Sequence, residues 1–172
     1  CFSNGCAATV DVSYPSIPMF LLYNPELVKG MMRPVIRYAK SDAWIFDFAP
    51  HDVGQYPLVN GQVYGQNVLK YQMPVEECGN MIISVAAACV ALDDFTYAGK
   101  HFDVLKKWSN YLVEYGLDPE NQLCTDDFAG HLAHNANLSV KAIMGIAAWG
   151  MLKGMMGDKN AESNYISVSR DL

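Results

Sequence analysis

Apolar residues along this chain recur at helical spacing, so the pattern predicts a protein built from helices. The first predicted helix covers residues 25–40 and follows Asn24, a residue type that caps helix starts well. Pro34 lies inside this helix and is expected to kink it. Its expected inward side chains are three or four positions apart: Leu27, Met31, Val35 and Tyr38.

Two later segments are apolar on nearly all sides, which is typical of inner helices that are covered on every face. The first covers residues 75–92 and is opened by Pro74. The second covers residues 137–156, with Asn137 as its expected N-cap and Gly157 as its end. The first is expected to be covered on both sides, and its apolar residues include Met81, Ile82, Val85, Ala86, Cys89 and Val90.

The segment between them, residues 96–115, is amphipathic and predicts an outer helix. Gly116 is expected to end it in a left-handed cap, and a short further helix is expected near Asn160. The expected inward residues are Phe102, Leu105, Trp108 and Leu112. Alternating inner and outer helices predict an all-α fold of helical hairpins in two layers.

Residues 41–73 have no helical period and are rich in aromatic residues, glycine and proline. Only residues 62–64 resemble a strand. A connection of this length in a compact protein is usually functional.

The composition predicts one globular domain spanning residues 1–172, with 51% hydrophobic and 17% charged residues. A net charge of −6 and the lack of basic runs argue against nucleic acid as a partner. No apolar stretch was expected to reach the roughly 18 residues of a membrane span. The start at Cys1, without a Met or a targeting segment, suggests a portion of a longer protein.

The five cysteines are odd in number and show no zinc-ligand spacing. Cys1 and Cys6 are close enough for a small disulfide loop, and Cys89 is expected to be a buried thiol. No cofactor is expected.

Paired carboxylates are the first candidate for catalytic chemistry. Glu76 and Glu77 occupy the first turn of a predicted helix, and Asp126 and Asp127 are adjacent in a polar loop. A general acid and a general base on opposite sides of a cleft would need such groups. The alternative is structural: helix capping and a salt bridge for the glutamates, and a turn for the aspartates. Glu77 is favoured over Glu76, which can serve the cap.

Several polar and aromatic residues are candidates for substrate binding: His51, Asp52, Tyr56, His131, His134 and Asn135. His131 and His134 would share a face if their segment were helical. A zinc site there is disfavoured, because the spacing lacks the glutamate of known zinc motifs, so no metal is expected. Polar clusters at three helix entrances suggest that one cleft collects them.

Four segments carry a resemblance to a known family: FAPHDVGQYP (48–57), NGQVYG (60–65), QMPVEECGNM (72–81) and LDPENQLCTDDFAGHLAHN (117–135). They resemble the six-helical-hairpin domain of the glutaminase A family. The resemblance implies part of an (α/α)6 toroid, roughly its first half, related in fold to six-hairpin glycosidases. It also implies a secreted or periplasmic location.

The resemblance implies hydrolysis of L-glutamine to glutamate and ammonia, with water activated by an acid and a base in the toroid mouth. Hydrolysis of a glycoside is the alternative, because the fold and the acidic, aromatic loops suit a sugar equally. A third alternative is a non-catalytic fragment or binding module. In that case the uncovered apolar faces of the inner helices would drive homo-oligomerisation.

Overall fold

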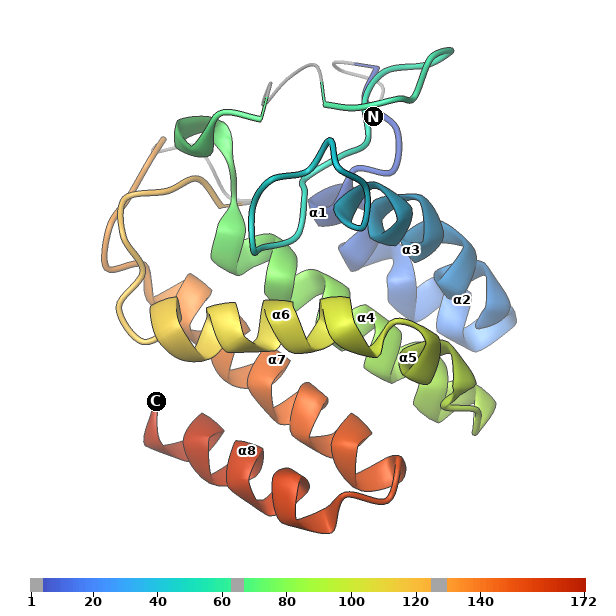
Figure 1. Cartoon of the computed structure of the whole chain (residues 1–172), viewed down its shortest axis with the longest axis vertical. Helices are drawn as coiled ribbons and strands as arrows, with labels where there is room; N and C mark the ends of the chain where they lie inside the picture. The colour runs from blue at the N-terminus through green and yellow to red at the C-terminus, as the bar shows by residue number, and fades with distance from the viewer. Residues whose placement is uncertain (1–4, 63–66, 125–129) are drawn as a thin grey trace.

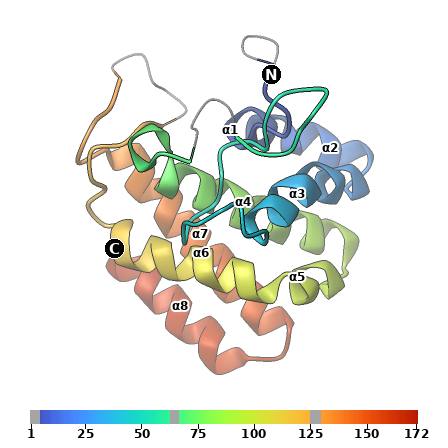
Figure 2. The same ribbon diagram turned by 45° about the horizontal axis from the view of Figure 1, so that its top comes forward.

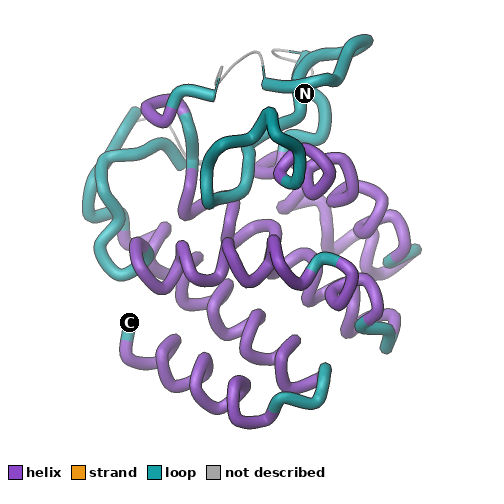
Figure 3. The backbone as a smooth tube through the Cα atoms, in the orientation of Figure 1, coloured by secondary structure: helices purple, strands orange, loops and turns teal. Residues whose placement is uncertain are grey.

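The computed structural model describes residues 5–62, 67–124 and 130–172. Within these ranges the regular elements are helices, joined by long loops (Figure 3). They are α1 (Val10–Ser13), η1 (Tyr14–Ser16), α2 (Ile17–Tyr23), α3 (Glu26–Ala39), η2 (Leu69–Tyr71), α4 (Pro74–Leu92), α5 (Thr96–Lys100), α6 (Phe102–Tyr115), α7 (Ala136–Met155) and α8 (Lys159–Asp171). Two isolated β-bridges, Cys6–Gln55 and Gln122–Leu132, tie the loops together. The predicted all-α fold is confirmed.

The helices form antiparallel hairpins around α4 and α7. Figures 1 and 2 show these two helices side by side and starting at the same end, while α6 and α8 run back in the opposite direction. Tight packing of α4 on α7 depends on Gly79, because a Cβ at this position would overlap the side chain of Lys141. The predicted two-layer arrangement of inner and outer helices is therefore present.

The core is built mainly on α4, which is buried along most of its length. This helix is 19 residues long, with a mean hydropathy of 1.5. By length and composition alone, it is long and apolar enough to cross a membrane. The expectation that no apolar stretch reaches that length was therefore wrong. Because 72% of its apolar stretch is buried inside the protein, its length and composition are weak evidence of a membrane span and fit a core helix equally.

The first predicted helix is confirmed as α3, but its inward face was placed partly wrong. Val35 and Tyr38 are buried as expected, whereas Leu27 is 49% exposed and Val28 is buried instead. Asn24 accepts a hydrogen bond from the Glu26 N–H, at 3.2 Å, as a residue at a helix start does. In α4, which was expected to be covered on both sides, Val90 is exposed.

The predicted outer helix is two helices, α5 and α6, which meet at His101. Its predicted inward residues Leu105, Trp108 and Leu112 are fully buried. Gly116 follows α6 with φ −86°, so the expected left-handed cap was wrong. A glycine fits there because a Cβ would overlap Ala142 of α7.

The last two helices follow the prediction with small differences. Asn135, not Asn137, caps α7, and its side chain accepts a hydrogen bond from the Asn137 N–H. Gly157 adopts φ +98° after the helix end, as expected of a terminating glycine. The helix expected near Asn160 is α8, at 13 residues longer than predicted.

Two short helices, α1 and α2, precede α3 and were not predicted. Cys89 is buried, as expected. The proposed partner of Cys6, Cys1, lies outside the described residues, and so does most of the strand-like segment 62–64.

Candidate functional site

The long loops gather at the end of the molecule where α4 and α7 begin (Figures 1 and 3). One loop precedes α4, and a second, described at residues 117–124 and 130–135, precedes α7. They meet at Val75, whose N–H donates to the side-chain oxygen of Gln122 at 3.1 Å. Residues that the sequence separates are thus brought to one end of the inner helices.

Glu76 is buried and paired with a cation from the neighbouring inner helix. Its Oε1 lies 3.0 Å from Nζ of Lys141 on α7. Asn80, one turn further along α4, accepts from the same Nζ at 2.6 Å and donates to Glu76 Oε1 at 3.2 Å. The Lys141 ammonium also lies over the ring of Tyr14, 3.9 Å from its centroid. This network ties α4, α7 and the N-terminal helices together.

Glu77 is fully buried and has no cationic Lys or Arg partner of its own among the ion pairs of the described residues. Its Oε2 accepts from Asn80 at 3.0 Å, while Oε1 has no hydrogen-bond partner in the described structure. Burial raises the pKa of Glu77 well above its usual range, although the charge of nearby His51 acts in the opposite direction. The site thus favours a neutral carboxyl, or a carboxylate with added positive charge beside it.

His51 is held between two carboxylates. Its Nδ1 lies 2.9 Å from Asp52 Oδ2, and its Nε2 lies 3.2 Å from Asp11 Oδ1. Asp52 is fully buried and fixed by the Gly54 N–H, which donates to Oδ1 at 2.8 Å. Burial lowers the pKa of His51, but hydrogen bonding to the two aspartates and the charge of Glu77 outweigh this effect and raise it to about 10.

Asp11, His51 and Glu77 converge on one point, and we call them the acid–histidine cluster. One donor atom from each side chain lies within 4.8 Å of the others. They come from α1, from the loop before α4 and from the first turn of α4. His51 and Glu77 were predicted as candidates with different roles in one cleft, whereas Asp11 was missed. Its only signal in the sequence is a carboxylate in a short segment without a clear helical period.

The remaining predicted site residues have other neighbours. The ring of His131 lies 2.8 Å from the carbonyl oxygen of Lys70, and His134 lies 2.6 Å from Asp118 at the surface. Asn135 caps α7 and donates to the sulfur of Cys124 at 3.3 Å. Tyr56 is exposed.

These four residues make no contact with the acid–histidine cluster among the interactions found in the described residues. Asp126 and Asp127 lie outside the described residues. Their predicted roles, like the catalytic role of Glu76, stay predictions.

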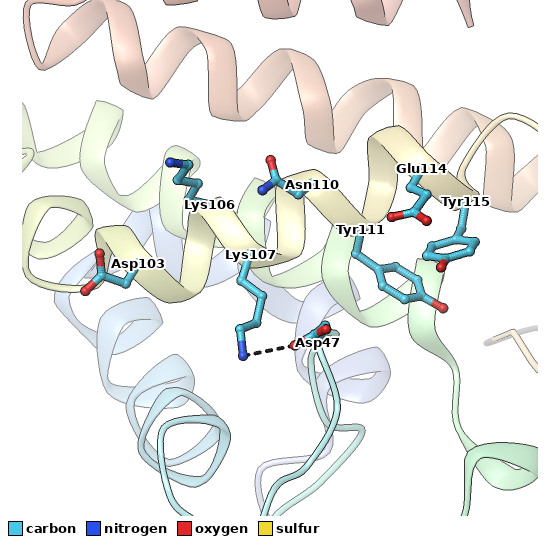
Figure 4. A pocket seen from close by; sticks show the side chains of 8 residues that line it. All are labelled: Asp47, Asp103, Lys106, Lys107, Asn110, Tyr111, Glu114 and Tyr115. Atoms are coloured by element: carbon cyan, nitrogen blue, oxygen red, sulfur yellow. Dashed lines mark ion pairs between the residues drawn. The ribbon is translucent and has the colours of Figure 1, made fainter.

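Two adjoining hollows lie beside α6, and both are lined by Asp47, Tyr111 and Tyr115. The first has a volume of about 460 Å³, and Figure 4 shows Lys107 reaching Asp47 across it, at 3.1 Å. The second, of about 690 Å³, adds the stacked rings of Phe46 and Phe48. Neither hollow is lined by the acid–histidine cluster.

The chemistry of the cluster follows from its burial. The side chains of His51 and Asp11 are 12% and 14% exposed, so solvent reaches the cluster at this edge. A group of two carboxylates and an imidazole can hold a water molecule or a cation there and can exchange protons with it.

Comparison with known proteins places these observations in context. A family model described as the glutaminase A six helical-hairpin domain matches residues 1–172. The chain is 40% identical, over 98% of its length, to a protein named Glutaminase A from Aspergillus oryzae. It is 30% identical, over 96% of its length, to a protein named "Probable glutaminase" from Arthroderma benhamiae. It spans 24% and 26% of these two relatives, about a quarter of their length.

Proposed function

This chain belongs to the glutaminase A six helical-hairpin domain family, and we propose that it serves the hydrolysis of L-glutamine to glutamate and ammonia. In this reaction water adds to the side-chain amide carbon, the C–N bond breaks, and the nitrogen leaves after gaining a proton. The reaction therefore needs a group that polarises water and a group that delivers a proton.

The observation that carries the proposal is the acid–histidine cluster, together with the two relatives that are named as glutaminases. Asp52 orients His51, and the buried first turn of α4 presents Glu77 to the same point. We assign the polarisation of water to this cluster. Glu76, which is bonded to Lys141 and Asn80, would position its neighbour Glu77 rather than react.

Hydrolysis of a glycoside is a second candidate, and the hollow of about 690 Å³ favours it. The rings of Phe46, Tyr111 and Tyr115 beside Glu120 and Asn121 would suit a sugar, which stacks on aromatic faces and hydrogen-bonds through its hydroxyl groups. This hollow shares no lining residue with the acid–histidine cluster. Glutamine hydrolysis and glycoside hydrolysis are therefore expected to respond to different substitutions.

The test compares ammonia release from L-glutamine with reducing-sugar release from aryl glycosides. Both are measured for this chain and for a longer protein that contains it. We expect ammonia release from the longer protein, and weak or no turnover from the 172-residue chain alone. Glu77→Gln should abolish the ammonia release, whereas the exposed control Glu26→Gln should leave it unchanged. Sugar release that survives Glu77→Gln and is lost in Tyr115→Ala would establish the second candidate instead.

A further inference from the structure

The acid–histidine cluster has the arrangement of a metal site. Asp11, His51 and Glu77 approach from three separate elements, with one donor atom of each within 4.8 Å of the others. Ligand atoms bound to one ion at about 2.0–2.3 Å must be within roughly 4.6 Å of each other, so the described positions need only a small contraction. We propose that these three side chains bind one divalent first-row transition cation, such as Zn²⁺ or Mn²⁺.

The orientation of His51 supports a ligand role for its Nε2 atom. Its Nδ1 lies 2.9 Å from Asp52, which is fully buried and fixed in turn by the Gly54 N–H. A carboxylate bonded to one ring nitrogen of a histidine fixes the tautomer and directs the other nitrogen at a metal. That second nitrogen lies on the side of Asp11, at 3.2 Å from Oδ1.

The buried carboxylate oxygens of the cluster also support a bound cation. Glu77 Oε1 is buried and has no hydrogen-bond partner in the described structure, and the buried Asp11 Oδ1 has only the contact with His51 Nε2 at 3.2 Å. Glu77 is 0% exposed, and an unsatisfied buried carboxylate oxygen is costly. A cation between the two side chains would satisfy both oxygens at once.

The charges around the cluster leave room for a cation. Four acidic side chains gather here: Asp11, Asp52, Glu76 and Glu77. Lys141 is the single lysine among their ion pairs in the described part of the chain, and it is bonded to Glu76. His51 is the other cationic group, and an ion bound at its Nε2 would replace the proton there. A divalent ion would offset the excess of negative charge beside Glu77.

The donor set selects the class of ion. One imidazole nitrogen and two carboxylates suit zinc and manganese, whereas calcium and magnesium prefer sites made of oxygen alone. The burial of Glu77 also favours a small ion over an organic substrate at this point. The partly exposed edges of Asp11 and His51 provide an entry path. The inference departs from the expectation that the chain holds no metal.

The test is cation binding to the chain after chelator treatment and dialysis. Calorimetry with Zn²⁺ and Mn²⁺ should show one ion bound per chain, and Ca²⁺ and Mg²⁺ should bind more weakly. Binding should also raise the midpoint of thermal unfolding, as expected for an ion that binds the folded state. Co²⁺ should give visible d–d bands without a thiolate charge-transfer band. A thiolate band, or no saturable binding, would overturn the proposal.

Substitutions identify the ligands. Asp11→Asn and Glu77→Gln should remove the binding, and Asp52→Asn, which changes the hydrogen bond that orients His51, should weaken it about 10–100-fold. The exposed control Glu26→Gln and the nearby thiol control Cys6→Ser should bind like the unmodified chain. Undiminished binding by both Asp11→Asn and Glu77→Gln would contradict the assignment.

Folding of each variant is checked by circular dichroism without metal. If a variant does not fold, the Co²⁺ spectrum and stoichiometry of the unmodified chain decide the case. These experiments concern the cluster used in the proposed function but read binding rather than ammonia release. The two proposals are therefore tested separately. The chain can lack metal binding although the longer protein hydrolyses glutamine, or it can bind metal although the longer protein does not.

Discussion

Lys141 of α7 reaches Glu76 of α4, with Nζ 3.0 Å from Oε1, and so joins the two inner helices through a buried ion pair. The side chains are 13% and 2% exposed, which places the pair well away from bulk water. Asn80 bonds to both partners and also to Glu77. The ion pair therefore stabilises the first turn of α4, which carries Glu77 of the acid–histidine cluster.

Removing the ammonium group of Lys141 should lower the free energy of unfolding. Lys141→Met keeps much of the side-chain volume but leaves Glu76 buried without its partner, so we expect a loss of about 3–5 kcal/mol in the free energy of unfolding. Urea-induced unfolding at pH 7 measures it. Adding Glu76→Gln to the same chain should recover part of the loss, because the unpaired charge is then gone. The control Lys107→Met, at a half-exposed pair with Asp47, should cost at most about 1 kcal/mol.

The close packing of α4 on α7 at Gly79 should also be sensitive to substitution. Alanine there improves helix propensity by about 1 kcal/mol, but its methyl group would overlap the side chain of Lys141. We expect Gly79→Ala to lower the free energy of unfolding by about 1–3 kcal/mol, as overpacking does.

Gly30 of α3 is the matched control, because a Cβ there has open space around it. Gly30→Ala should stabilise the chain by about 0.5–1 kcal/mol. If urea unfolding shows the same change in free energy for both substitutions, helix propensity rather than the contact with Lys141 determines the effect of each.

Much of the helical fold could be predicted from local patterns. Residues 74–92 form one helix because proline opens the segment and apolar residues continue through it. The break at His101 was missed because the amphipathic pattern continues across it. Leu27 was placed inward because a helical face read from spacing can be rotated by one position, and only packing against α4 determines which residue is covered.

The candidate site was harder to predict, because its contacts join distant parts of the chain. The polar clusters that contain His51 and Glu77 were expected to share one cleft, but sequence spacing gave no reason to expect a direct approach of these two side chains. Asp11 lies in a helix of four residues, too short for a periodic signal. His131 and His134 looked equally promising, but their loop turns them toward Lys70 and Asp118.

The pH dependence of stability should contain a contribution from His101. Burial, followed by the charges of Lys40, Lys100 and Arg33, lowers the pKa of His101 below its usual 6.5. The unfolded chain therefore binds a proton more readily than the folded chain. The stability due to neutral His101 is complete above pH 6.5 and declines as the pH falls from 6.5 through the lowered pKa.

His101→Phe tests this contribution, because phenylalanine retains a ring against Tyr97, whose centroid lies 4.7 Å away, and cannot take up a proton. Urea unfolding measured between pH 7 and pH 5 should show a smaller loss of stability for this variant than for the unmodified chain. Tyr97→Phe keeps His101 and should retain the original slope. Parallel slopes for His101→Phe and the unmodified chain would contradict the assignment.

The start of α7 provides a test of helix capping, because two asparagines lie close together there. The side chain of Asn135 accepts from the Asn137 N–H at 3.0 Å, whereas Asn137 is exposed within the first turn. Asn135→Ala should therefore lower the free energy of unfolding by about 1 kcal/mol, and Asn137→Ala should change it by no more than about 0.5 kcal/mol. Thermal unfolding followed by circular dichroism at 222 nm measures both. The reverse order of effects would return the cap to Asn137 and move the start of the inner helix.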